Sequence, residues 1–453
     1  MSAATGALLA DLAGAGDVVV DPDVIESYRR DQAAPGLLAA GMPVAVVWPR
    51  TTHEVQVALR AASRHGVPVV PRGAGSGLSG GANAVDGCIV LCLERMTDVV
   101  ALDDASLTAT VQPGIVNAAL GEAARRAGLW YAPDPASYEF STIGGNVATN
   151  AGGLCCVKYG VTRDAVLGLE VVLAEGRAVR LGRRTRKGVV GYDLAALMCG
   201  SEGTLGVVTE VTVRLQPPPR VASTLAASFP ELGGAGEAIA RIVRERRPSL
   251  LELMDRTTVR AVESFQPMDL DVDAAALLFA RSDEGFVDVA WMAARCEEAG
   301  ATLVVTSDEE AEGRMILAAR RLAYTALERL GTTLLDDVGV PIAAIPALVT
   351  GIERIAADHD VLVATFGHAG DGNMHPTVVY DHHDADATAR ARAAFAAIVE
   401  LALSLGGTAT GEHGVGLLKR DFVAAELGDA LELHRAVKHA LDPRGLLNPG
   451  KAL

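Results

Sequence analysis

The 453-residue chain has few cysteines and no long apolar run, and each shortage excludes a class of protein. Its six cysteines include no C-x-x-C pair, which argues against a disulfide framework and against an internal iron–sulfur cluster. No segment approaches the roughly 18 uninterrupted apolar residues of a membrane span. The first residues lack the basic region and apolar core of a secretory signal, so we expect a cytoplasmic location.

Positive charge is also scarce. Forty Lys and Arg residues against 56 Asp and Glu residues give a formal net charge of −16. Such a chain as a whole is a poor partner for nucleic acid or an anionic membrane surface. A small anionic substrate would therefore need a local cationic pocket.

Short β-branched runs alternate with amphipathic stretches between residues 44 and 215, a pattern that predicts an α/β or α+β domain. The domain should begin with a strand, a helix and a second strand, at 44–48, 51–64 and 67–70. Thr51 and Glu54 form the capping box that begins this helix. The second strand leads directly into a glycine-rich loop.

Three consecutive prolines, Pro217-Pro218-Pro219, predict a domain boundary because they cannot continue a helix or a central strand. We expect an N-terminal helical segment at 1–38, one domain at 39–218 and a second domain at 219–453. The second domain should also be α+β, with strands near 250–254, 302–306 and 361–366 and helices near 314–330 and 385–405.

Two histidine-bearing glycine loops lie near the C-terminus, at 367–376 and 411–416. His368, His375 and Glu412 are ligands suited to a divalent cation such as zinc, manganese or iron. His413 is left beside them as a base. The alternative is that both loops are ordinary tight turns with histidines satisfied in the core. The spacing of the first two histidines is unlike the helical pair of a zinc protease, so the ligands should come from loops or strand ends.

The glycine loop Pro71–Gly81 follows a predicted strand, and its successive backbone N–H groups could surround a pyrophosphate. It lacks the Gly-Lys-Ser/Thr of a Walker loop, and no long helix follows as a dinucleotide Rossmann fingerprint requires. Taken alone, it is equally compatible with a flexible turn. Two further glycine segments accompany it, at 133–153 and 200–209.

These three segments, in this order, resemble the FAD-binding domain of the vanillyl-alcohol oxidase/para-cresol methylhydroxylase superfamily. The C-terminal histidine loops resemble the FAD-linked D-2-hydroxyacid dehydrogenases and oxidases, the group that includes the glycolate oxidase flavin subunit and D-lactate dehydrogenases. The match runs from about Val44 to Lys451. It implies an α+β protein: a two-subdomain FAD-binding domain of the para-cresol methylhydroxylase (PCMH) type, then an α+β substrate or cap domain with an antiparallel sheet.

The resemblance also implies a set of FAD-binding residues. Those expected to wrap the pyrophosphate are Arg72, Gly73, Ala74, Gly75, Ser76, Gly77, Leu78 and Ser79. Those expected to line the rest of the cofactor are Pro135, Thr142, Gly145, Asn146, Gly152, Gly203 and Val208, with Asn448 approaching the flavin from the tail. Some family members attach FAD covalently through a histidine in the glycine loop. This loop has neither histidine nor cysteine, so we expect non-covalent FAD.

For the reaction, the resemblance implies that a 2-hydroxyacid is oxidised to the 2-oxoacid with hydride transfer to flavin N5. His368, His375 and Glu412 would hold the metal, and His413 would be the general base. Arg320 matches the family's carboxylate-binding arginine, with Tyr324 and Asn373 also at the substrate. The alternative for Arg320 is a solvated helix charge, which is what we expect of Arg321.

Relatives that oxidise 2-hydroxyglutarate carry a lysine six residues before the proline of the Asp337–Pro341 turn, where this chain has Leu335. The difference favours a small monocarboxylate of the D-lactate or glycolate type. D-2-hydroxyglutarate or a longer 2-hydroxyacid is the alternative substrate. A non-catalytic FAD-binding subunit of a larger oxidase and a metal-dependent hydrolase are the alternatives from other classes.

Expected partners follow from the same reasoning. Electrons would leave to an external acceptor: an iron–sulfur partner subunit, a cytochrome, a quinone, an electron-transfer flavoprotein or oxygen. Neither nucleic acid nor a transmembrane segment is expected. A homodimer is compatible with the sequence, as is attachment to the inner face of a membrane through a partner.

Overall fold

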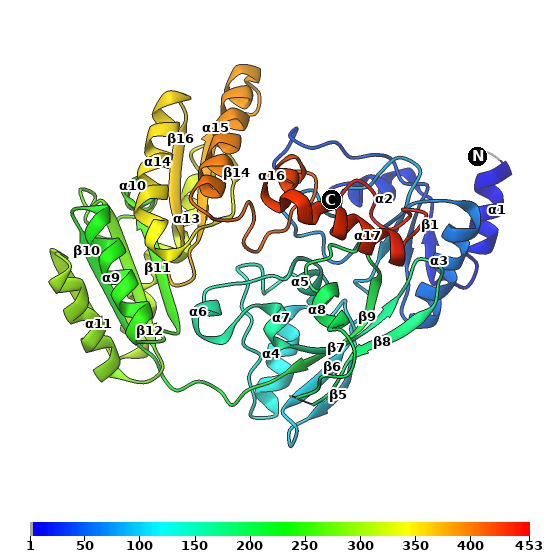
Figure 1. Ribbon diagram of the computed structural model, residues 1–453, viewed down its shortest axis with the longest axis horizontal. Coiled ribbons are helices and arrows are strands. Elements are labelled where there is room, and N and C mark those ends of the chain that lie inside the picture. Colours follow the sequence, from blue (N-terminus) through cyan, green and yellow to red (C-terminus); the bar gives the residue numbers. More distant parts are fainter. Residues whose placement is uncertain (1–2, 186) are drawn as a thin grey trace. The chain divides into compact units, whose positions relative to one another are not determined.

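The computed structural model describes residues 3–185 and 187–453, which form two compact units (Figure 1). Unit 1 contains residues 1–152, 160–218 and 412–453, and unit 2 contains 153–159 and 219–411. The chain enters unit 2 after Pro218, where the prolines predicted a boundary. By their contacts, residues 412–453, the last part of the domain expected at 219–453, group with unit 1.

The tail belongs to unit 1 because it adds to that unit's first sheet. Leu447 forms a parallel bridge with Val69, and the backbone N–H of Asn448 donates to Val69 O over 2.8 Å. The preceding helices are α16 (Val423–Leu427) and α17 (Leu431–Leu441). The turn-rich tail therefore packs on the body of the protein, beside the strand that leads into the glycine loop.

The first sheet of unit 1 has the strand order β1-β2-β4-β3, and β4 pairs in parallel with both β2 and β3. Its strands are β1 (Asp17–Val19), β2 (Ala45–Trp48), β3 (Val69–Arg72) and β4 (Ile89–Cys92). Helix α3 (Thr52–His65) joins β2 to β3, as predicted, and Thr51 caps it by accepting the N–H of Glu54. Its apolar side packs with α1 (Ala3–Asp11) and the sheet in one core.

The second sheet of unit 1 is antiparallel, in the order β5-β6-β9-β7-β8. Its strands are β5 (Val99–Asp103), β6 (Thr108–Val111), β7 (Val166–Val172), β8 (Ala178–Gly182) and β9 (Val207–Arg214). Every second residue of β9 is buried, which is the alternation of a strand with one face on a core. Helices α4 (Asn117–Arg126), α5 (Ile143–Thr149) and α8 (Leu194–Met198) contribute to that core.

Unit 2 is built on one antiparallel sheet of eight strands, in the order β13-β10-β12-β11-β16-β17-β14, with β15 also paired to β17. This is the antiparallel sheet that the sequence predicted. Its strands are β10 (Ser223–Phe229), β11 (Leu250–Asp255), β12 (Ala276–Ser282), β13 (Leu303–Ser307), β14 (Thr332–Leu335), β15 (Val338–Gly339), β16 (Leu362–His368) and β17 (Asn373–Tyr380).

Helices cover both faces of this sheet. Four helices pack against their neighbours and against one face of the sheet, as Figure 1 shows: α9 (Leu232–Glu245), α11 (Phe286–Glu298), α14 (Ile345–Asp358) and α15 (Ala385–Ser404). The other face carries α10 (Arg256–Phe265), α12 (Glu310–Ile316) and α13 (Ala318–Glu328). One helix was expected over 314–330, but the structure has two, α12 and α13, separated by a turn at Leu317.

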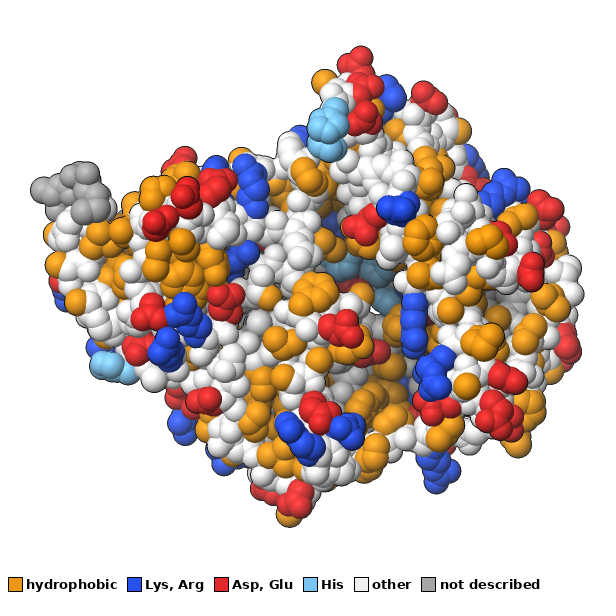
Figure 2. All heavy atoms as spheres, turned by 180° about the vertical axis from the view of Figure 1, so that it is seen from behind, with side chains coloured by type: hydrophobic (Ala, Val, Ile, Leu, Met, Phe, Trp, Pro, Cys, Tyr) orange, Lys and Arg blue, Asp and Glu red, His pale blue; other side chains and the backbone are white. Residues whose placement is uncertain are grey.

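The surface carries charges of both signs. On the face shown in Figure 2, acidic and basic side chains are interspersed, and neither sign forms a continuous area. None of the helices among the described residues is both long enough and apolar enough to cross a membrane.

Candidate active site

The glycine loop begins where β3 ends at Arg72. Gly75 and Gly80 have φ angles of 71° and 76°, a backbone region that favours glycine. A Cβ on Gly73 would lie 2.3 Å from Thr142 Oγ1, so a side chain there would collide with the start of α5. The first two predicted glycine segments are therefore in contact, and glycine permits that contact.

The loop presents unpaired backbone donors. Among residues 3–185 and 187–453, nothing accepts a hydrogen bond from the N–H groups of 74–78. Nearby, the buried Ser141 Oγ and Asn146 Nδ2 have no hydrogen-bond partner in this part of the chain either. Buried polar groups are normally satisfied, so these atoms indicate the position of a polar ligand. A row of free N–H groups suits a pyrophosphate, and the residues present fit FAD.

The third glycine segment is hydrogen-bonded to the second. The N–H groups of Gly200 and Glu202 donate to Val147 O and Ala148 O at 2.9 and 2.8 Å. Gly203, with φ 70°, lies close enough to Pro71 that a Cβ would be 3.0 Å from its ring. The three glycine segments predicted from the sequence thus converge within unit 1.

The other predicted cofactor residues lie on the same unit. Thr142 caps α5 by accepting the N–H of Gly145, and Val208 lies on β9. Pro135 is buried and begins a turn in which its carbonyl accepts the N–H of Tyr138, and Gly152 is buried at the end of its segment. Nothing in these contacts contradicts their predicted role.

Arg72 is held against its own loop. Its Nη1 donates to Arg30 O over 2.9 Å, and its guanidinium lies 5.5 Å from the centre of the Tyr28 ring. A Cβ on Gly75 would lie 2.0 Å from Arg72 Nη2. The arginine therefore stabilises the loop shape from within.

Asn448 joins the tail to two glycine segments. Its Nδ2 donates to Gly81 O at 2.9 Å and to Glu202 O at 2.7 Å, and its Oδ1 accepts from Lys451 Nζ at 2.9 Å. Lys451 also donates to Asn83 O, and burial lowers the pKa of its ammonium group to about 8. The tail thus fixes the back of the predicted FAD cradle.

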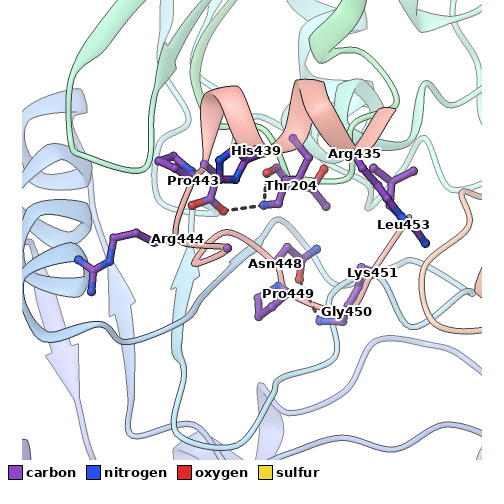
Figure 3. A pocket seen from close by; sticks show the side chains of 13 residues that line it. Thr204, Arg435, His439, Pro443, Arg444, Asn448, Pro449, Gly450, Lys451 and Leu453 are labelled. Atoms are coloured by element: carbon purple, nitrogen blue, oxygen red, sulfur yellow. Dashed lines mark hydrogen bonds and ion pairs between the residues drawn. The ribbon is translucent and has the colours of Figure 1, made fainter. Parts of the chain in front are cut away.

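A cavity of about 470 Å³ lies beside this tail (Figure 3). Its lining includes Arg435, Lys438, His439, Arg444 and Asn448. The Lys438 ammonium already donates to two backbone carbonyls and to Asp442. Asn448 is the single predicted site residue in the lining, so this cavity is not the predicted cradle.

In unit 2, Arg320 on α13 forms a buried ion pair that the sequence reasoning missed. Its Nε and Nη2 lie 2.8 and 2.7 Å from Glu252 Oε2, and the guanidinium also lies 4.7 Å from the Phe366 ring centre. Glu252 is completely buried, and its other oxygen lies 2.6 Å from His368 Nδ1. One carboxylate therefore holds the predicted substrate arginine and a predicted metal ligand. Arg321 is exposed, as expected.

His368 and His375 lie side by side at the β16–β17 hairpin. Their ring centres are 5.1 Å apart with the planes nearly perpendicular. His375 Nδ1 lies 3.7 Å from Oδ1 of Asp337, a buried residue that the sequence analysis did not select. Asp337 Oδ2 accepts from Thr410 Oγ1 and from the N–H of Gly411. Imidazoles beside carboxylates form a donor set that suits a divalent metal.

The remaining predicted substrate residues are placed as follows. Asn373 pairs with His368 across the hairpin, and its Oδ1 is buried without a partner among the described residues. Tyr324 lies on α13 and bonds through its hydroxyl to Thr333 on β14. Burial raises the pKa of this phenol. Asn373 is therefore open to a further hydrogen bond, whereas Tyr324 is engaged with the sheet.

Glu412 and His413 belong to unit 1, whereas His368 and His375 belong to unit 2. The His413 carbonyl accepts from Ser79 Oγ at 3.4 Å, and Ser79 O accepts the N–H groups of Leu417 and Leu418. His413 Nε2 lies 3.9 Å from Glu412 Oε1. The loop of the predicted base is thus bonded to the end of the glycine loop.

Three acidic residues with structural roles at the site were not selected from the sequence: Glu202, Glu252 and Asp337. A signal existed for Glu252, since it is the one charge in the apolar run 250–254, and a buried carboxylate requires a partner. Nothing local distinguishes the other two from turn residues.

Comparison with known proteins agrees with this geometry. Residues 43–182 match the family described as FAD binding domain, and 218–452 match FAD linked oxidases, C-terminal domain. The chain is 42% identical over 448 residues to glycolate oxidase subunit GlcD of Bacillus subtilis, covering 97% of this chain and 93% of the relative. It is 34% identical to a D-lactate dehydrogenase of Anaerostipes hadrus over 96% of this chain and 94% of that one.

A solved structure shows the same fold. p-Cresol methylhydroxylase with substrate bound superposes with a TM-score of 0.81 at 18% identity, over 99% of this chain and 96% of that one. The expected PCMH-type architecture is confirmed, and the chain belongs to the FAD-linked oxidases.

Proposed function

We propose that this protein uses non-covalently bound FAD to oxidise a small D-2-hydroxyacid, of the D-lactate or glycolate type, to the 2-oxoacid. One observation carries the proposal: within unit 1, the loop of His413 is hydrogen-bonded through Ser79 to the loop whose free N–H groups suit a pyrophosphate. The loop of the base and the cofactor cradle are therefore joined by hydrogen bonds within unit 1. Relatives described as a glycolate oxidase subunit and as D-lactate dehydrogenases support the substrate class.

FAD, when bound, supplies the two-electron acceptor for the hydride from the substrate Cα. His413 takes the hydroxyl proton on an imidazole nitrogen, as histidine most often does in general base catalysis. Ser79 fixes the backbone of this base by donating to its carbonyl. The free N–H groups of 74–78 orient the cofactor from the pyrophosphate side.

Arg320 binds the substrate carboxylate. Its Nε and Nη2 are committed to Glu252, and no described residue bonds to Nη1, so that nitrogen remains for the substrate. The Glu252 pair holds the guanidinium in one orientation, which reduces the ordering cost of substrate binding. Asn373 Oδ1 offers an acceptor on the same face of the sheet.

His368 and His375, with Glu412, would hold a divalent metal of the zinc, manganese or iron type. The Glu252 carboxylate at His368 Nδ1 is the outer partner that metal-bound histidines commonly have. Such an ion would supply Lewis acidity towards the substrate oxygens. Asp337, which lies beside His375, is a further candidate for a residue that surrounds the metal ion.

Leu335 supports a monocarboxylate substrate. It lies on β14 among partly buried apolar side chains that pack on the core with α13, where it offers no positive charge to a second carboxylate. Electrons would then leave to an external acceptor, because the cysteines form no C-x-x-C pair that would indicate an internal iron–sulfur cluster. A partner subunit or a diffusible acceptor would receive them.

Anaerobic flavin bleaching tests the proposal. The purified protein is mixed with D-lactate, L-lactate, glycolate, D-2-hydroxyglutarate and longer D-2-hydroxyacids, and flavin absorbance is followed. Rapid bleaching by D-lactate or glycolate is expected. A yellow protein that none of these acids reduces would contradict the activity, and a colourless protein that cannot be reconstituted with FAD would contradict the cofactor.

A further inference from the structure

Glu202 is a buried acid whose two carboxylate oxygens both bind the backbone that follows His413. Oε1 accepts the N–H of Val415 at 2.8 Å, and Oε2 accepts the N–H of Gly416 at 2.9 Å. The residue is only 8% exposed. A carboxylate that accepts two backbone N–H bonds away from water constrains that backbone strongly, because charge-assisted hydrogen bonds are stronger than neutral ones.

The backbone of Glu202 is itself in an unfavourable conformation. Its φ angle is 50°, in the left-handed region that costs energy for a residue with a side chain. Asn448, which donates to Glu202 O, also has a positive φ of 42°. Two such residues bonded to each other indicate a geometry that the surrounding structure enforces, and strained backbone of this kind concentrates at functional sites.

Gly414 lies between His413 and the two bonded amides. Its φ is 84°, and a Cβ there would lie 3.1 Å from the Glu202 carboxyl carbon, closer than ordinary packing allows. Only glycine therefore lets the chain pass over this carboxylate. Ser79 holds the carbonyl of His413, and Glu202 holds the amides of the residues two and three positions further along the chain.

We propose that Glu202 is a positioning residue for His413, acting by clamping the backbone of 415–416 and so fixing where the imidazole lies. This inference rests on the proposed role of His413 as the base. Its effect is geometric, and displacement of a catalytic group by about 1 Å can cost on the order of 100-fold in rate.

The test compares Glu202→Gln with a matched control, Glu170→Gln. Glu170 is also a largely buried glutamate of unit 1, bonded through its carboxylate to Thr52 and Arg180 and making none of the bonds to 415–416. Glutamine in place of Glu202 presents an amide N–H to one of the two backbone N–H groups. One hydrogen bond is therefore replaced by repulsion between two donors. Both variants are first checked for bound FAD by absorbance.

Hydrogen exchange gives a readout that does not depend on activity. Peptides covering 411–418 should exchange faster in the Glu202→Gln variant than in wild type or in the Glu170→Gln control. Stopped-flow flavin reduction should show a rate constant at saturating substrate lowered by about 100-fold, with the substrate Kd changed much less. Unchanged exchange or an unchanged rate constant would overturn the proposal, as would an equal loss in the control.

A double-mutant cycle separates this inference from the proposed function. The His413→Ala variant should retain a slow residual rate of flavin reduction. If Glu202 acts through His413, adding Glu202→Gln to that variant should lower this residual rate by far less than 100-fold. An additive loss in the double variant would overturn the positioning role. A His413→Ala variant that reduces flavin normally would instead contradict the proposed base. Glu202→Asp, which keeps the charge but shortens the reach, should show the same rate loss and carries the test if the glutamine variant does not retain FAD.

Discussion

Glu252 and Arg320 form a buried ion pair in which one carboxylate oxygen lies 2.8 Å from Nε and 2.7 Å from Nη2. The side chain of Glu252 is fully buried and that of Arg320 is 11% exposed, so the carboxylate has no water as an alternative partner and the guanidinium has little. The second oxygen of the same carboxylate is bonded to His368. This acid therefore links the proposed substrate arginine to one proposed metal ligand, and its removal has a predictable cost.

Replacing Glu252 with Ala should destabilise unit 2 by about 3–5 kcal/mol, because it leaves a buried guanidinium unpaired. The measurement is the free energy of unfolding from urea denaturation followed by circular dichroism. Glu263→Ala is the control, since this glutamate accepts only backbone N–H groups at a helix end. A loss for Glu252→Ala no greater than the control's would show that the pair contributes nothing measurable.

Arg320→Lys should weaken substrate binding about tenfold, because a single ammonium group cannot hold Glu252 and a substrate carboxylate in the same plane. The substrate Kd comes from the concentration dependence of flavin reduction. The neighbouring Arg321 is exposed, so Arg321→Lys is a matched control expected to leave the Kd unchanged. Equal effects of the two substitutions would remove Arg320 from the substrate site.

His413→Ala should lower the rate constant for flavin reduction by about 10²–10⁴-fold while FAD stays bound, because the hydroxyl proton loses its acceptor. His65→Ala is the control. The exposed fraction of the His65 side chain, 21%, is similar to the 19% of His413, but His65 pairs with Asp11, the last residue of helix α1. Stopped-flow absorbance measures both variants. Normal reduction by the His413 variant would mean that another group is the base.

Gly75→Ala should weaken FAD binding, because its Cβ would collide with Arg72 inside the cradle as well as straining the backbone. Gly128→Ala separates these causes: Gly128 has nearly the same φ, 72° against 71°, but no atom within 4 Å of its Cβ position. Fluorescence titration of the apoprotein with FAD should show a raised Kd for the first variant alone. The idea fails if both glycines tolerate alanine equally.

Lys451 should make stability depend on pH. Burial lowers its pKa to about 8 from 10.5, so the folded state binds this proton less tightly than the unfolded state. The unfolded state then holds more protons between those two values, and stability attributable to this group rises with pH across that window. The thermal midpoint of wild type should therefore rise relative to that of Lys451→Met between pH 8 and 10.5. Parallel curves for the two proteins would contradict the assignment.

Local sequence signals predicted the elements that depend on short-range chemistry. The capping box at Thr51 and Glu54 marked the start of α3, and Thr51 does accept the N–H of Glu54. Glu54 Oε2, however, accepts the N–H of Arg50 over 2.5 Å, one residue before the expected partner. The strands near 250, 302 and 361 also lie where β-branched and apolar runs predicted them.

The candidate site was predictable as a set of residues but not as a set of contacts. The glycine segments and the two histidine loops were visible because glycine and histidine are chemically distinctive at short spacing. Glu202 looked like an ordinary residue of a Gly-Ser-Glu-Gly turn. Its importance comes from Val415 and Gly416, more than two hundred positions away in the sequence.

The sequence by itself indicated the family by resemblance, and it predicted the glycine segments and the candidate base and ligands, because glycine-rich and histidine-bearing segments are recognisable within short windows. Only the tertiary structure decided that residues 412–453 return to the FAD-binding unit and that Glu252 joins Arg320 to His368. The physical reason is burial. A carboxylate removed from water must find donors, and which donors it finds depends on strand pairing and helix packing between distant segments.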